Sequence, residues 1–136
     1  MANKIDVHTH AIPDFYQEHM KPLREHGGWT YIPWSVDATK SMAAKLGVKV
    51  SMLSLSAPGP EILKDKNGAR DCARQYNDVA ARLVKEEPAS FGFFAAVPNA
   101  VSDTKACLAE MKYAFDTLGA DGVTLHTQCV NQLAGW

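Results

Sequence analysis

The chain has 136 residues, 46% of them hydrophobic, and a formal net charge of −1 at pH 7. This length suits one domain, and this hydrophobic content suits a folded core. The near-neutral charge argues against a protein that neutralises nucleic-acid phosphates or attaches electrostatically to an anionic membrane. We find no apolar run long enough to span a bilayer, and the polar first residues predict no signal peptide. Three scattered cysteines do not form a disulfide framework, so we expect a cytoplasmic protein.

Hydrophobic patterns predict strands and helices in alternation along the chain. We expect strands at about 4–8, 48–55, 91–97 and 122–126. A long excursion follows the first strand, with one or two helical turns expected near 13–20. Ser35 and Gly47 are predicted to cap the next helix, and a further helix is expected over 68–87. The helix that begins at Ser102 or Asp103 has one apolar face, with Leu108, Met111, Phe115 and Leu118.

This order of elements predicts an α/β fold with parallel strands joined by right-handed crossovers. Two architectures accept such units: a doubly wound sheet, and a TIM-type (β/α)₈ barrel, which needs about 250 residues. Four strands would form half of such a barrel. Its first and fourth strands would then be open edges beside apolar surface, so we expect homo-oligomers or aggregation through these edges.

The motif His8-Thr9-His10 stands at the end of the first predicted strand. Side chains alternate along a strand, so both imidazoles are expected on one face, where they can bind one divalent metal ion. Asp6 has the same parity and is expected on that face as well. Two surface histidines without a metal are the alternative interpretation.

Three further residues are candidates for contacting a metal ligand or the substrate. Ser54 and Ser56 share parity at the end of the second strand, and their hydroxyls could bind substrate or a ligand histidine. Alternatively, they satisfy the backbone of the turn that follows. His126 ends the fourth predicted strand and could serve as a third ligand, although a histidine without that role is the favoured interpretation.

The segment Ile5-Asp6-Val7-His8-Thr9-His10 resembles the opening motif of the amidohydrolase superfamily. The segments 54–59, 91–98 and 118–123 are similar to its amidohydrolase-related branch, which includes aminocarboxymuconate-semialdehyde decarboxylase and the resorcylate-type decarboxylases. The resemblance covers about 4–128. It implies a metal-dependent (β/α)₈ barrel that acts on a small carboxylated, often aromatic, compound.

The resemblance implies Zn²⁺ as the usual metal, with His8 and His10 as ligands and Asp6 supporting them. The family completes this site with a histidine and an aspartate from its later strands and uses a further histidine for proton transfer. The sequence stops at Trp136, before those positions. We therefore expect one partial domain over 1–136, truncated and inactive alone, without the family's catalytic residues.

Three functions stay open at this point: a decarboxylase, a hydrolase of lactones or amides, and a non-enzymatic fragment or interaction module. The first two imply a small-molecule substrate. None of the three implies a nucleic-acid or membrane partner.

Overall fold

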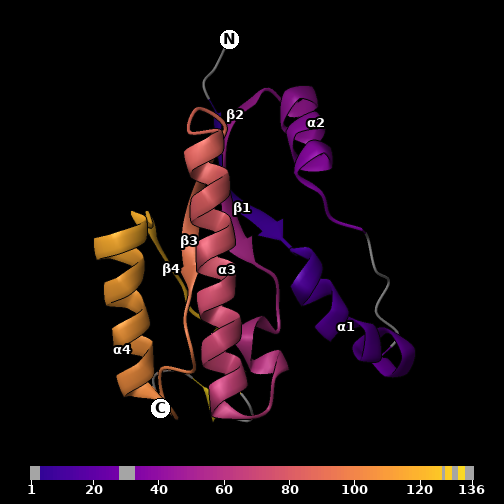
Figure 1. Cartoon of the computed structure of the whole chain (residues 1–136). Coiled ribbons are helices and arrows are strands. Elements are labelled where there is room, and N and C mark those ends of the chain that lie inside the picture. Colours follow the sequence, from indigo (N-terminus) through magenta and orange to yellow (C-terminus); the bar gives the residue numbers. More distant parts are fainter. Residues whose placement is uncertain (1–3, 28–32, 127, 130–131, 134–136) are drawn as a thin grey trace.

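The computed structural model describes residues 4–27, 33–126, 128–129 and 132–133, with side chains over 4–22 and 33–126. Its central sheet has the strand order β1 (Lys4–Ala11), β2 (Val48–Leu55), β3 (Phe91–Ala96) and β4 (Gly122–Thr124), and all neighbours are parallel (Figure 1). Sequential strands therefore lie side by side, as they do in successive units of a barrel. The predicted α/β organisation is confirmed.

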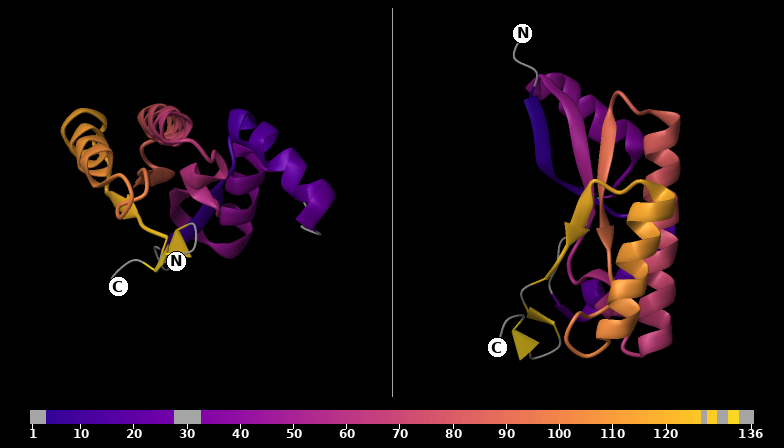
Figure 2. Two further views of the ribbon diagram at one scale, coloured as in Figure 1. Left: turned by 90° about the horizontal axis from the view of Figure 1, so that it is seen from below. Right: turned by 90° about the vertical axis from the view of Figure 1, so that its left-hand side faces the viewer.

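The connecting helices follow the strands in alternation. They are α1 (Asp14–Gly27), α2 (Val36–Leu46), η1 (Gly59–Ile62), α3 (Lys66–Glu86) and α4 (Thr104–Tyr113), which continues as the π-helical turn η2 (Ala114–Leu118). Helices α3 and α4 lie side by side over the same face of the sheet (Figure 2). The short strands β5 (Gln128–Cys129) and β6 (Gln132–Leu133) pair antiparallel near the carboxyl ends of the main strands.

The core lies between the sheet and α3. Alternate residues of β2 and β3 are buried there together with one face of the helix: Leu53, Leu55, Phe91, Phe93, Ala95, Cys72, Tyr76 and Ala80. The residues between them turn to the opposite face, where Met52 lies against Gly92. The period of two in each strand thus separates a helix-covered face from a face that α3 does not cover.

Several elements differ from their predicted extent or orientation. Strand β1 continues beyond the expected 4–8 to Ala11, so the HxH motif lies within the strand. Helix α1 is longer than the expected one or two turns, and β4 ends at Thr124 rather than at His126. In α4 and η2 the predicted apolar face is wrong in part, because Leu108 and Phe115 are 59% and 47% exposed, whereas Leu118 packs against the core. The buried residues on this side are Cys107, Glu110 and Ala114, and the carboxylate of Glu110 is buried because Arg74 and Asn77 donate to it.

Two polar side chains fix the backbone of β3. The Asn77 amide of α3 donates to the carbonyl of Ala96 and accepts from its N–H, both at 2.8 Å. The Asp121 carboxylate accepts from the N–H of Phe93 at 3.0 Å, and the Asp121 N–H donates to the Phe93 carbonyl at 3.0 Å. A Cβ at Gly92 would lie 2.7 Å from that carboxylate, so glycine leaves the room that Asp121 needs.

Candidate metal centre

His8 and His10 lie close together near the carboxyl end of β1. Their Nε2 atoms are 3.2 Å apart, and their rings cross at 87°. Two imidazole nitrogens with this separation, each about 2.1 Å from one ion, would subtend about 100° at the ion. That angle lies between the octahedral and tetrahedral values. The two side chains are exposed, and the separation of their Nε2 atoms is compatible with a shared divalent metal ion.

The surroundings of His10 favour the neutral imidazole that binds metals. Partial burial lowers the pKa of His10, and the neighbouring His8 lowers it further. A neutral imidazole offers a lone pair to a metal ion, whereas a protonated one does not.

Asp6 does not share the face of His8 and His10, and that expectation is wrong. Asp6 pairs with Ser51 and Thr9 pairs with Leu53. Between these two pairs β1 advances by three residues while β2 advances by only two, so β1 contains a bulge. This bulge reverses the alternation of side chains. Asp6 lines a hollow beside α2 instead, and its Oδ1 accepts a hydrogen bond from the His8 N–H at 3.0 Å.

The two serines after the middle of β2 have different surroundings. Ser54 is the partner of His10 in the register of β1 and β2, so it lies beside the histidine pair on the same face. Ser56 lies in the loop that follows β2, and its carbonyl accepts from the Tyr16 hydroxyl and from the Gly59 N–H. The structure therefore brings Ser54 to the candidate site and ties the backbone of Ser56 into the loop.

His126 lies two residues after the end of β4 and is half-buried. Its ring lies against Gly59, where an added Cβ would be 2.7 Å from Nε2. Burial lowers the pKa of His126, while the negative charge of Glu61 raises it and His10 lowers it. Among the residues with described side chains, no three His, Cys, Asp or Glu groups are close enough together to hold a metal ion.

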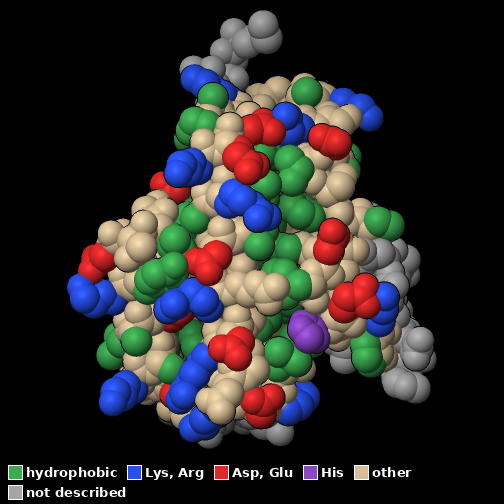
Figure 3. Space-filling model, viewed as in Figure 1, with side chains coloured by type: hydrophobic (Ala, Val, Ile, Leu, Met, Phe, Trp, Pro, Cys, Tyr) green, Lys and Arg blue, Asp and Glu red, His purple; other side chains and the backbone are tan. Residues whose placement is uncertain are grey.

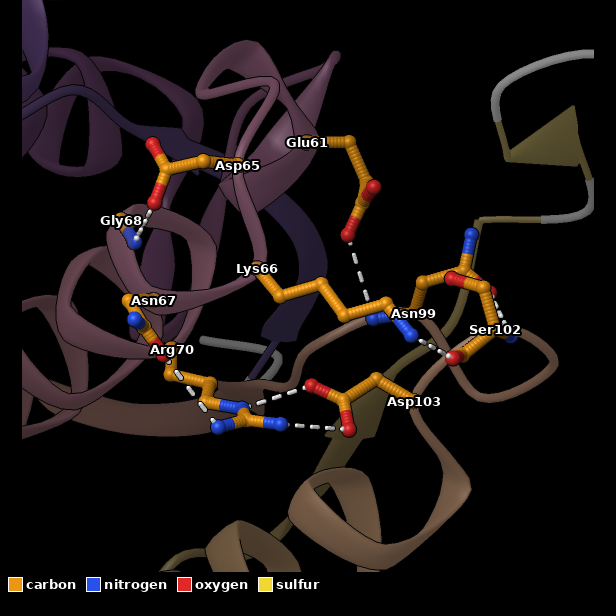
Figure 4. A network of polar contacts seen from close by, with 9 residues as sticks. All are labelled: Glu61, Asp65, Lys66, Asn67, Gly68, Arg70, Asn99, Ser102 and Asp103. Atoms are coloured by element: carbon orange, nitrogen blue, oxygen red, sulfur yellow. Dashed lines mark hydrogen bonds and ion pairs between the residues drawn. The ribbon is translucent and has the colours of Figure 1, made fainter.

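Sequence reasoning missed Glu61. Glu61 does not belong to a periodic pattern of polar residues along a predicted strand or helix. The one sequence feature that could have drawn attention to it is its position in the turn after β2. Its Oε1 accepts from the Asn99 N–H at 3.1 Å, which joins the loop after β2 to the loop after β3 (Figure 4). Lys66 reaches the carbonyl of Ser102 in the same network.

The face formed by α3 and α4 has mixed charge. Figure 3 shows Lys and Arg side chains interspersed with Asp and Glu, so a single-sign patch of the kind that binds nucleic acid does not occupy this face. No helix in the described part of the chain has the length and hydropathy needed to cross a membrane.

Known proteins resemble this chain in sequence and in fold. No protein-family profile matches it. The 6-methylsalicylic acid decarboxylase acuB of Aspergillus aculeatus is 42% identical over 126 residues, which are 92% of this chain and 38% of that protein. The crystal structure of an amidohydrolase II superposes with a TM-score of 0.82 at 29% identity, covering 93% of this chain and 41% of that one.

A dihydroxybenzoic acid decarboxylase of Polaromonas sp. JS666, crystallised with manganese and 2-nitroresorcinol, has the same fold. Its TM-score is 0.74 at 24% identity, over 90% of this chain and 38% of that chain. The chain thus spans well under half the length of these proteins, and its four parallel strands match part of their barrel. In sequence and fold the chain is therefore similar to part of the amidohydrolase-fold decarboxylases, in agreement with the resemblance carried by its opening motif and its later segments.

Proposed function

We propose that this chain supplies the first metal ligands of a decarboxylase that acts on a small aromatic carboxylic acid. The observation that carries the proposal is the His8–His10 pair, with Nε2 atoms 3.2 Å apart, in a chain 42% identical to a 6-methylsalicylic acid decarboxylase. That relative is named for its reaction. Its name favours decarboxylation over the hydrolysis of a lactone or amide.

The residues of this chain have separate roles in the proposed site. His8 and His10 hold the metal ion, and Asp6 fixes the backbone of His8 through its N–H. Ser54 lies beside His10 and offers a hydroxyl to a ligand or to substrate. When bound, a divalent metal supplies positive charge that neutralises and orients a substrate carboxylate.

The metal is divalent in this proposal. Two imidazoles suit Zn²⁺, whereas manganese is the ion named with the related Polaromonas structure.

Cys72 and Cys107 are buried free thiols, and burial raises the pKa of the Cys72 thiol to about 12. Such thiols suit the reducing cytoplasm, where we place the protein.

Ion binding by single-histidine variants tests the metal centre. We expect the chain to bind one Mn²⁺, measured by the electron paramagnetic resonance of the free ion, and Zn²⁺ to compete for the same site. His8→Ala and His10→Ala should each weaken binding by more than about tenfold, because each removes one of two ligands. His19→Ala, on α1, is the matched control and should bind like the unaltered chain.

Equal Mn²⁺ affinity in His8→Ala and the unaltered chain would refute the assignment of the ligands. The reaction itself is tested by release of CO₂ from 6-methylsalicylate by this protein, before and after removal of the metal with a chelator. Release that does not depend on the metal would refute the proposed function.

A further inference from the structure

The segment after β4 brings a third imidazole to the edge of the sheet that carries the histidine pair. Strand β4 ends at Thr124, and His126 follows shortly after it. Carboxyl ends of parallel strands share one edge of a sheet, which is where such folds bind ligands. The parallel order β1-β2-β3-β4 therefore places His126 and the histidine pair at the same edge of one sheet.

The loop after β2 holds this ring in place. Gly59 has a φ of +72°, and an added Cβ would lie 2.7 Å from Nε2 and 2.9 Å from Cδ2 of His126. The ring therefore packs directly on bare backbone. Glu61 and His126 also line the same small hollow of about 40 Å³, together with Pro98, Asn99 and Leu125.

The two loop residues are themselves anchored. The buried Tyr16 hydroxyl donates to the Gly59 carbonyl at 3.0 Å, and the Asn99 N–H donates to the Glu61 carboxylate at 3.1 Å. A side chain that rests on anchored groups has few rotamers available, which lowers the entropy it loses on binding a ligand. Such preorganisation is typical of residues that bind a ligand.

We propose that His126 is a substrate-binding residue of the metal centre and that Gly59 and Glu61 position its ring. The proposal rests on the proposed function, because the ligand it implies is an aromatic 2-hydroxy acid. The Nε2 atoms of His8 and His10 are 3.2 Å apart, so in the proposed site both of them are used to hold the metal ion. An imidazole outside that pair can donate a hydrogen bond to the carboxylate or hydroxyl of the acid.

Salicylate binding to the Mn²⁺-loaded chain tests the role of His126. We expect His126→Gln to bind Mn²⁺ within about twofold of the unaltered chain and to bind salicylate about tenfold more weakly, the cost of one good hydrogen bond. His19→Gln is the matched control and should change neither affinity.

Unchanged salicylate affinity in His126→Gln would refute the proposal. A tenfold loss of Mn²⁺ affinity in that variant would also refute it, since His126 would then be a metal ligand. Failure of the unaltered chain to bind either Mn²⁺ or Zn²⁺ would instead overturn the ligand role of His8 and His10, and this binding is measured before any variant is tested.

Glu61→Gln tests the positioning role separately. Glutamine keeps an oxygen for the Asn99 N–H but removes the negative charge beside His126. We expect the ring proton signals of His126 to shift in the NMR spectrum and salicylate to bind about threefold more weakly, a change below the cost of a whole hydrogen bond. Glu87→Gln, which alters a surface pair with Lys40, is the control. Unshifted His126 signals in Glu61→Gln would refute the positioning role.

Discussion

Replacing Gly59 with alanine tests the contact that seats His126, and Gly47 offers a control with the same backbone strain. The two glycines have φ values of +72° and +66°. An L-residue in this left-handed region costs about 1–2 kcal/mol at either position. A Cβ at Gly47 would have nothing within 4 Å, whereas at Gly59 it would lie 2.7 Å from Nε2 of His126.

The difference between the two variants in free energy of unfolding measures the cost of displacing the His126 ring. Ordinary contacts of a Cβ begin at 3.4 Å, so His126 or the loop must move by 3.4 − 2.7 = 0.7 Å. Overpacking of this kind costs a further amount of about 1–3 kcal/mol. We therefore expect Gly59→Ala to lower the free energy of unfolding by about 2–5 kcal/mol and Gly47→Ala by about 1–2 kcal/mol.

Urea unfolding followed by circular dichroism gives both values, and NMR spectra of the folded variants report on the His126 ring. Salicylate binding should weaken in Gly59→Ala and stay unchanged in Gly47→Ala. Equal destabilisation by the two variants, with unmoved His126 signals in Gly59→Ala, would show that the ring does not rest on Gly59.

Three other changes probe the fold. Asn77→Ala leaves both backbone groups of Ala96 without their buried partner, and we expect urea unfolding to show a loss of about 3–5 kcal/mol; a loss below about 1 kcal/mol would contradict this. Tyr16→Phe removes the hydroxyl that donates to two carbonyls of the loop after β2, and we expect a loss of about 1–2 kcal/mol in the same assay. Because Ile5 and Val7 are 61% and 63% exposed on an edge strand, we expect the chain to associate as its concentration rises. Ile5→Lys should reduce the mass measured by light scattering, and an unaltered mass would place the contact elsewhere.

The order of the elements could be predicted because each one carries its own local signal. Ser35 caps α2 through the Ala38 N–H, and Gly47 ends that helix in the left-handed conformation, both as the sequence predicts. The HxH spacing likewise predicted two imidazoles on one side, because they belong to one short stretch of a single strand.

The remaining features depend on how separate segments meet. The face of Asp6 could not be predicted, because counting parity assumes that β1 and β2 pair without a bulge. The buried face of α4 was missed because Glu110 is buried by Arg74 and Asn77 of α3, so polarity alone gives the wrong orientation. Glu61 has no periodic signal, and its place beside His126 arises only when the ends of β2 and β4 come together.

Asp121 holds both backbone groups of Phe93 before β4 begins, and this sets the starting point from which the chain reaches His126. In a strand, each added or removed residue turns all later side chains to the other face. The segment from Asp121 to His126 therefore acts as a spacer of fixed length, whose ends are defined by β3 on one side and by Gly59 on the other. Homologous chains should tolerate substitutions within this spacer far better than insertions or deletions. Only a change in its length would separate the imidazole of His126 from Gly59.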